Sequence, residues 1–273
     1  MSRINACFDN LAALGKKALI PYITAGDPTP EHTVTIMNGL VAAGADVIEV
    51  GMPFSDPMAD GPVIQLACER SLAAGTSVRK VLDIVRQFRE QNTDTPVVLM
   101  GYLNPIEFFG YQAFAHSAKE AGVDGILLVD LTPEEATDVV ECFRENDIDL
   151  IYLLSPTTTP ARAKKICELA SGYVYYVSVK GVTGSTALDV DSVKKHVDSL
   201  REITHLPIGV GFGIRDAQTA AAVSQCSDGV IVGSVLVNAI AENQNQTKEY
   251  IADALQSILA PMRAQMDAEQ SGS

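Results

Sequence analysis

The chain has 273 residues, 47% of them hydrophobic, and a formal net charge of −14. This length suits one large domain or two small ones. The negative charge argues against nucleic acid and anionic membranes as partners, because both bind basic surfaces. A phosphorylated small molecule is not excluded, because backbone N–H groups at the start of a helix bind phosphate without basic side chains.

The first segment, MSRINACFDNLAALGKK, is typical of an amphipathic helix, with Ile4, Phe8, Leu11 and Leu14 on one side. It lacks the apolar core of a signal peptide, and no apolar run reaches the roughly 18 residues of a membrane span. The cysteines are scattered and include no C-x-x-C pair, which is typical of a reducing compartment. The sequence therefore predicts a cytoplasmic protein.

Short apolar runs alternate with helical patterns along the rest of the chain. The runs are mostly apolar throughout, as strands buried on both faces are, and cover 18–24, 47–50, 96–100, 125–129, 149–154, 173–177, 207–210 and 229–232. Apolar spacings of three and four predict helices over 30–43, 62–73, 77–91, 111–121, 133–146, 160–170, 190–201, 214–224 and 246–266.

This alternation predicts a parallel sheet with right-handed crossovers. Eight such units fit the (β/α)8 TIM barrel, which has about 250 residues. An open doubly wound sheet is the alternative, but the first strand ends in ITAGDPT, without a G-x-G-x-x-G fingerprint. We predict one α/β domain, a (β/α)8 TIM barrel over 1–268. It has an additional N-terminal helix, long loops after strands two and six, and a disordered tail over 269–273.

Carboxylates gather where the second strand ends, in ADVIEVGMPFSDPMADGP. Glu49 ends an apolar run that contains no Lys or Arg, and strand ends of this kind carry the chemistry of a barrel. Glu49 therefore fits a general acid/base with a pKa raised by burial, with a structural ion pair as the alternative. Asp60 fits either a second site carboxylate or a cap before Gly61-Pro62, and Asp56 fits a turn better.

Glycine motifs follow strands seven and eight, as GVGFGI and DGVIVGS. Glycine lets the backbone approach a ligand, and these two loops commonly form the phosphate site of a barrel. Gly211, Gly213, Gly233 and Ser234 are the candidates, and tight turns are the alternative.

The segment KGVTGSTA, which starts at Lys180, fits either a mobile lid or a disordered loop. Lys180 also leaves open a Schiff-base aldolase. The histidines lie away from the strand ends and have no ligand spacing, so no metal site is predicted.

In their order and spacing these motifs resemble the tryptophan synthase α subunit family over nearly the full chain. The matching segments are PYITAGDP (21–28), EVGMPFSDPMADGPVIQ (49–65), GYLNP (101–105), GVDGILLVDL (122–131), SPTTTPAR (155–162), GVTG (181–184), GVGFGI (209–214) and DGVIVGS (228–234). The resemblance implies a lyase that cleaves indole-3-glycerol phosphate to indole and glyceraldehyde 3-phosphate. It also implies an α2β2 heterotetramer whose β subunit holds pyridoxal phosphate and condenses indole with L-serine to L-tryptophan, with no cofactor in this chain.

The resemblance also assigns roles to residues, with Glu49 as the catalytic acid/base and Asp60 as the carboxylate that binds indole. The substrate residues that it implies are Tyr22, Met100, Leu127 and Tyr175 around indole, Thr183 in the lid, and Gly184, Gly211, Gly213, Gly233 and Ser234 at the phosphate. The implied partner contacts are Pro53 and Asp56, on an exposed crest over 53–58, and Tyr102 and Asn104 in the next loop.

One departure concerns the lid, because Val179 and Lys180 follow Ser178 where many members of the family carry an arginine. Two further alternatives stay open. One is another barrel enzyme of the same pathway, although such an enzyme would lack the paired SDP and ADG acids. The other is a non-catalytic subunit that only activates a partner, against which the intact Glu49 and Asp60 argue.

Overall fold

The computed structural model describes residues 2–178, 189–211 and 213–271, and its strands form a closed parallel barrel. The strands are β1 (Ala18–Thr24), β2 (Ile48–Gly51), β3 (Val97–Gly101), β4 (Gly125–Leu128), β5 (Asp149–Leu154), β6 (Val174–Val177), β7 (Ile208–Gly211) and β8 (Gly229–Val232). Each strand pairs with the next, and β8 pairs with β1 through Ala18 and Gly229. The predicted (β/α)8 barrel is confirmed, and every predicted strand boundary lies within one residue of the observed one.

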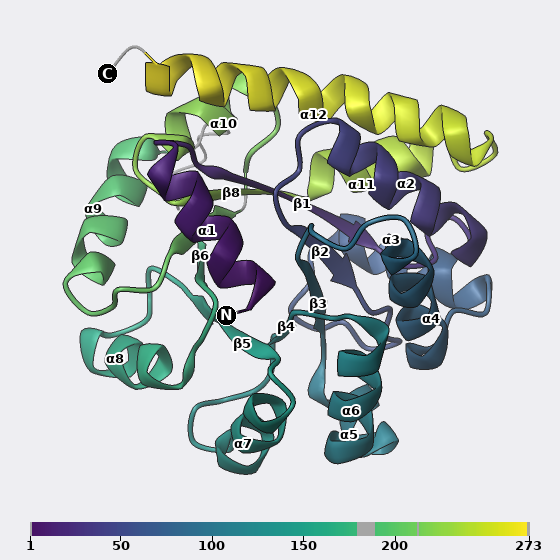
Figure 1. The fold of residues 1–273 in the computed structure, drawn as a ribbon, viewed down its shortest axis with the longest axis horizontal. Helices are drawn as coiled ribbons and strands as arrows, with labels where there is room; N and C mark the ends of the chain where they lie inside the picture. The colour runs from purple at the N-terminus through teal and green to yellow at the C-terminus, as the bar shows by residue number, and fades with distance from the viewer. Residues whose placement is uncertain (1, 179–188, 212, 272–273) are drawn as a thin grey trace.

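Helices surround the barrel (Figure 1). They are α1 (Arg3–Ala13), α2 (Pro30–Ala42), α3 (Pro62–Ala73), α4 (Val78–Arg89), α5 (Leu103–Phe109), α6 (Tyr111–Ala121), α7 (Thr137–Glu145), α8 (Pro160–Leu169), α9 (Val190–Arg201), α10 (Ala217–Ser224), α11 (Ser234–Glu242) and α12 (Lys248–Ser271). Proline begins α2, α3 and α8, where its missing N–H has no helical partner to lose.

Several helix boundaries differ from the prediction. The short α5 and the apolar α11, which follows β8 directly, were not predicted. The helix predicted from Pro133 begins at Thr137, because residues 132–135 form a turn closed by the N–H of Glu135 on the carbonyl of Thr132. The last helix continues to Ser271, so the disordered tail predicted over 269–273 is wrong for 269–271, where Glu and Gln favour helix. Residues 272–273 lie outside the described part.

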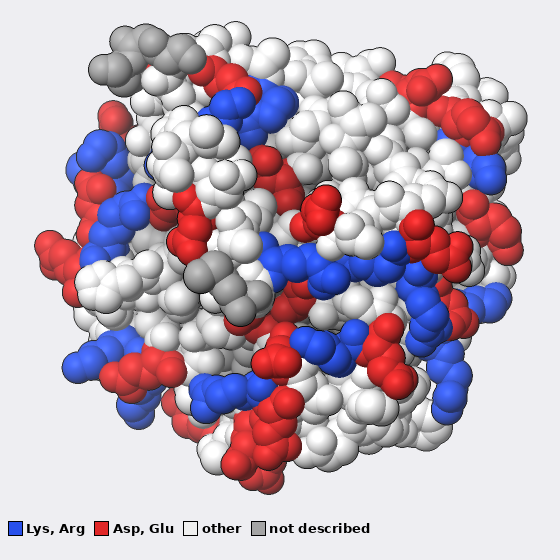
Figure 2. Space-filling view, in the orientation of Figure 1, with Lys and Arg blue, Asp and Glu red and all other residues white. Residues whose placement is uncertain are grey.

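Helix α1 closes the amino end of the barrel. Ile4, Phe8 and Leu11 are buried in the cluster that fills the barrel interior, and Figure 1 shows α1 lying across this end. Leu14 is 63% exposed, contrary to its predicted place on the buried face, because it follows the last helical residue. Figure 2 shows acidic and basic side chains interspersed over this face. With the amino end covered, the carboxyl ends of the strands are left for a binding site.

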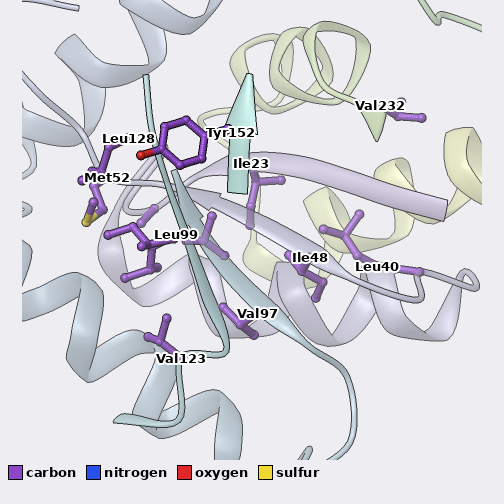
Figure 3. Packing of buried hydrophobic residues seen from close by; sticks show 14 of the residues in the cluster. Ile23, Leu40, Ile48, Met52, Val97, Leu99, Val123, Leu128, Tyr152 and Val232 are labelled. Carbon is purple, nitrogen blue, oxygen red and sulfur yellow. The ribbon is translucent and has the colours of Figure 1, made fainter. Parts of the chain in front are cut away.

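A larger apolar cluster fills the layer between the strands and the surrounding helices. Figure 3 shows part of it, with Ile23 of β1, Ile48 of β2 and Leu99 of β3 among its side chains. Tyr152 lies in the same layer at 4% exposure, and its hydroxyl has no hydrogen-bond partner among the described residues. No helix in the described ranges is long and apolar enough to cross a membrane.

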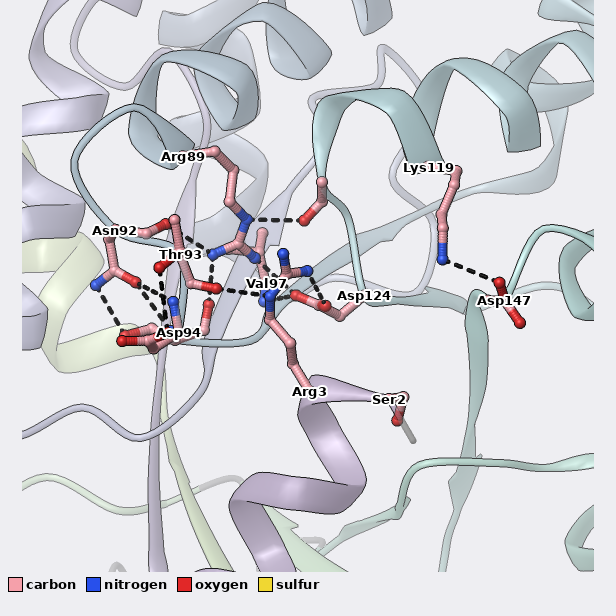
Figure 4. Close-up of polar contacts among 12 residues, drawn as sticks. Ser2, Arg3, Arg89, Asn92, Thr93, Asp94, Val97, Lys119, Asp124 and Asp147 are labelled. Atoms are coloured by element: carbon pink, nitrogen blue, oxygen red, sulfur yellow. Dashed lines mark hydrogen bonds and ion pairs between the residues drawn. The ribbon is translucent and has the colours of Figure 1, made fainter.

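Asp124, just before β4, is the centre of a polar network at the amino end (Figure 4). Its carboxylate accepts hydrogen bonds from Arg3 at 2.8 Å, from Arg89 at 2.6 Å and from the backbone N–H of Val97 at 2.8 Å. The Asp124 side chain is 5% exposed, so these bonds are shielded from water. The network ties α1 and α4 to the start of β3 and β4.

Candidate active site

A cavity of about 400 Å³ opens at the carboxyl ends of the strands. Its lining includes six predicted substrate residues, namely Tyr22, Met100, Tyr175, Gly213, Gly233 and Ser234, together with Asp60. A larger cavity of about 590 Å³ lies at the amino end, beside Arg3 and Asp124. That cavity borders none of the strand-end motifs, and Arg3 and Asp124 are bonded to each other. The smaller cavity is therefore the candidate active site.

Glu49 points into the barrel because side chains alternate along β2, with Ile48 and Val50 facing the helices. It is fully buried, and its Oε1 accepts a hydrogen bond of 2.5 Å from the hydroxyl of Tyr173. Its Oε2 has no partner among the described residues. Burial raises the pKa of Glu49 to about 7, although the Tyr173 hydrogen bond acts in the opposite direction. A carboxyl with this pKa exchanges its proton near neutral pH.

Glu49 does not line the cavity in this structure. Tyr173, its partner, is also fully buried and packs its ring against Phe8 of α1, with the ring centroids 5.7 Å apart. Sequence reasoning missed Tyr173, which carries no motif and was noted only as the first residue of a predicted strand. Its contact with Glu49 spans 124 residues of sequence and arises only when the barrel closes.

Asp60 is held at the edge of the cavity by Tyr102. The Tyr102 hydroxyl donates to Asp60 Oδ2 at 3.0 Å and accepts from the N–H of Ala59 at 3.0 Å. Burial raises the pKa of Asp60, and the Tyr102 hydrogen bond opposes that rise. The cap of α3 is Gly61, without a side-chain hydrogen bond, so the alternative role of Asp60 as a helix cap is wrong.

Two glycines make room for the tyrosines of the cavity. A Cβ atom on Gly51 would lie 2.1 Å from the Tyr22 hydroxyl, and one on Gly211 would lie 2.1 Å from the Tyr175 hydroxyl. Gly211 is not among the lining residues. It therefore makes room for Tyr175 of the neighbouring strand, and its predicted place at the phosphate stays a prediction.

The amino end of α11 faces the cavity through Gly233 and Ser234. Gly213 also lines the cavity and has a φ of +82°, which favours glycine. The first N–H groups of a helix have no partner inside it and carry partial positive charge. This corner can bind an anion without a basic side chain.

Other predicted site residues lie elsewhere. Leu127 is fully buried in the barrel interior and does not line the cavity, where Val129 and Leu153 stand instead. Val129 lies two residues after Leu127, on the same face of the chain because side chains alternate along a strand. It lines the cavity because it lies closer to the carboxyl end of the barrel. The predicted lid, with Thr183, Gly184 and Lys180, lies outside the described residues.

The predicted partner contacts are divided between surface and interior. Asp56 and Asn104 are exposed, as expected. Pro53 is buried beside the end of β2, and Tyr102 is 4% exposed because it reaches inward to Asp60, so both are wrong as surface residues. Two large apolar side chains are exposed nearby, Met58 at 86% in the loop after β2 and Phe108 at 95% in α5. Phe108 was missed because α5 was not predicted.

Within the described residues, no group of three or more His, Cys, Asp or Glu side chains could hold a metal ion. The geometry instead joins a buried carboxyl with a pKa near neutrality, a second carboxylate at the cavity, and a helix start suited to phosphate. This arrangement is that of a TIM-barrel enzyme whose cavity suits an anionic substrate.

Comparison with known proteins gives the family. The family described as "Tryptophan synthase alpha chain" matches residues 8–267. The tryptophan synthase alpha chain of Marinobacter nauticus is 61% identical over 268 residues, which cover 98% of this chain and 99% of that protein. The crystal structure of the alpha subunit from Legionella pneumophila has a TM-score of 0.91 at 48% identity, covering 98% of this chain and 99% of that one. This chain belongs to the tryptophan synthase alpha chain family.

The resemblance drawn from the motifs is thereby confirmed, and with it the predicted reaction. The chain is a lyase that cleaves indole-3-glycerol phosphate and passes indole to a β subunit. The Schiff-base aldolase and the other barrel enzymes of the pathway are set aside.

Proposed function

We propose that Glu49 and Asp60 perform the lyase reaction as a pair with different tasks. The observation that carries this proposal is their contrasting environment. Glu49 is fully buried with a pKa raised to about 7, whereas Asp60 is only partly buried and lines the cavity. Such a contrast is what separates a proton-transferring carboxyl from one that remains ionised.

The bond to be broken joins indole C3 to the glycerol phosphate chain, and an indole C3 carbanion is a poor leaving group. Glu49 first donates a proton to C3, which gives an indolenine cation. Asp60 accepts the N1–H hydrogen bond and stabilises that positive charge. A base then removes the proton of the side-chain hydroxyl next to C3, the carbon–carbon bond breaks toward the cation, and indole and an aldehyde are released. Glu49, ionised by the first step, serves as that base.

This mechanism requires Glu49 to turn from Tyr173 toward the cavity when substrate is bound. The movement breaks the hydrogen bond from Tyr173 to Oε1. It breaks none at Oε2, which has no partner among the described residues. The phosphate group of the substrate binds at Gly213, Gly233 and Ser234, with the N–H groups at the start of α11 as donors.

The exposed residues around the cavity form the docking face for the β subunit, in an α2β2 heterotetramer. Asp56, Met58, Asn104 and Phe108 make up this face, and its two apolar side chains support a protein contact. Pyridoxal phosphate belongs to the β subunit, and this chain works without a cofactor of its own. The cytoplasmic location predicted from the sequence stays a prediction.

The reaction is tested by supplying indole-3-glycerol phosphate to the pure chain and following indole fluorescence. The chain contains no tryptophan, so the background is low. We expect indole and glyceraldehyde 3-phosphate in equal amounts, faster when the β subunit is added. Absence of indole under both conditions would refute the proposal.

The docking face is tested with Met58→Ala and Phe108→Ala, each compared with Leu14→Ala at the opposite end of the barrel. Leu14 is a matched control because it is 63% exposed and apolar. We expect the first two variants to weaken binding of the β subunit by about tenfold each, as truncation of an anchoring side chain at an interface costs more than about 1 kcal/mol. Equal binding by all three would place the interface elsewhere.

A further inference from the structure

A second, much smaller cavity adjoins the active site. Its volume is about 10 Å³, roughly the room of one water-sized group. It shares Tyr22, Asp60, Met100 and Val129 with the lining of the main cavity. We call it the side pocket, and its remaining lining residues are Met52, Cys68, Gly101 and Tyr102. Because the two cavities share these four residues, little separates the side pocket from a bound substrate.

Sulfur side chains form much of the side-pocket wall. Met52 and Cys68 are each 4% exposed, and Met100 lies between the side pocket and the main cavity. The Met52 methyl group packs over Gly101, where a Cβ atom would lie 2.8 Å from it. Burial raises the pKa of Cys68, so its thiol is neutral at pH 7. Unbranched methionine side chains repack readily around a changed ligand.

We propose that the side pocket admits a small apolar substituent on the indole ring, and that Cys68 and Met100 set this specificity. The inference rests on the proposed function, in which Asp60 meets the N1–H group. Asp60 borders both cavities, so the side pocket lies at the N1 edge of the ring. The carbon of the six-membered ring on that edge is C7, whereas C4 lies on the opposite edge, next to C3. Substituents at C7 therefore enter the side pocket, and substituents at C4 do not.

Size sets the order of acceptance. A fluorine atom is close to the size of a water molecule and fits without rearrangement. A methyl group is larger and requires Met100 or Met52 to move. In a rigid apolar pocket one extra carbon changes specificity by about 10–200-fold, and an adaptable wall lies at the lower end of that range.

The test uses the reverse reaction, in which the enzyme condenses an indole with glyceraldehyde 3-phosphate. Indole, 7-fluoroindole, 7-methylindole and 4-methylindole are compared by kcat/KM. We expect 7-fluoroindole to stay within about threefold of indole and 7-methylindole to fall by about tenfold. We expect 4-methylindole to fall by about 100-fold or more, toward the upper end of the range for a rigid pocket.

Two substitutions of Cys68 then change the volume of the side pocket directly. Cys68→Ala enlarges the side pocket and raises the ratio of kcat/KM for 7-methylindole to that for indole. Cys68→Leu fills it and lowers that ratio by about tenfold. Cys142→Ala is the matched control, since Cys142 is a buried cysteine at 3% exposure in α7, and it leaves the ratio unchanged.

Equal use of 7-methylindole and 4-methylindole by the parent chain would overturn the inference. So would a ratio in Cys68→Ala equal to that of the parent chain, as when the side pocket holds a fixed water molecule. These outcomes require no variant that fails to fold, because the parent chain and Cys68→Ala suffice. Failure to condense unsubstituted indole would instead refute the proposed function, and the inference with it.

Discussion

Replacement of Glu49 by glutamine should make folding stability less dependent on pH while removing most of the lyase activity. The pKa of Glu49 is raised from 4.5 to about 7 by burial. A carboxyl of this kind holds its proton more tightly in the folded chain than in the unfolded one. Its contribution to stability is therefore complete below about pH 4.5 and is lost as the pH rises through about 7. About 2.5 pKa units at about 1.4 kcal/mol each give a total of about 3.5 kcal/mol.

The assay is urea unfolding of the parent chain and Glu49→Gln at several pH values. In the difference between their free energies of unfolding, the contributions of titratable groups that the two chains share cancel. Relative to the variant, the parent should lose about 2.5 kcal/mol between pH 5 and pH 8. Lyase activity of the variant should fall by about 10²–10⁴, the usual worth of general acid/base catalysis.

Tyr173→Phe supplies the matched comparison for this measurement. Its hydroxyl favours the ionised form of Glu49, so its removal should move the loss of stability to higher pH. A difference between the parent and Glu49→Gln that stays constant within about 0.5 kcal/mol from pH 5 to pH 8 would refute the reasoning. That result would mean that water or a movement of the chain keeps the carboxyl solvated.

Asp60→Asn should lower the rate of indole release without unfolding the chain, since an amide stabilises the indolenine cation less well than a carboxylate. Tyr102→Phe removes the hydrogen bond that lowers the pKa of Asp60, so the acid limb of the kcat/KM profile should move to higher pH. Tyr152→Phe should raise the free energy of unfolding by up to about 1 kcal/mol, because it removes a buried hydroxyl that has no partner in the described chain. Asp124→Ala should destabilise the chain by about 3 kcal/mol in urea unfolding, whereas Lys194→Ala, which breaks an exposed ion pair, should leave the free energy of unfolding nearly unchanged.

The sequence by itself determined the barrel and its order of elements. Strands buried on both faces are continuously apolar, and prolines or capping residues mark the starts of helices, so local patterns carry this information. It also determined that Glu49 and Asp60 stand at a strand end and in the loop that follows. Helices with a weak apolar pattern were not predicted. An example is α5, which has Ile106 as its one buried residue and therefore shows no apolar spacing.

Only the tertiary structure decided which side chains meet. Tyr173 reaches Glu49 across the barrel, and Tyr102 turns inward to Asp60 although the sequence placed it on the partner face. Leu127 is buried in the barrel interior, whereas Val129 lines the cavity. The Tyr175 hydroxyl occupies the space that a side chain at Gly211 would need. The physical reason is that closure of the barrel brings together residues far apart in the chain. The pKa of a carboxyl and the shape of a cavity depend on those neighbours rather than on local sequence.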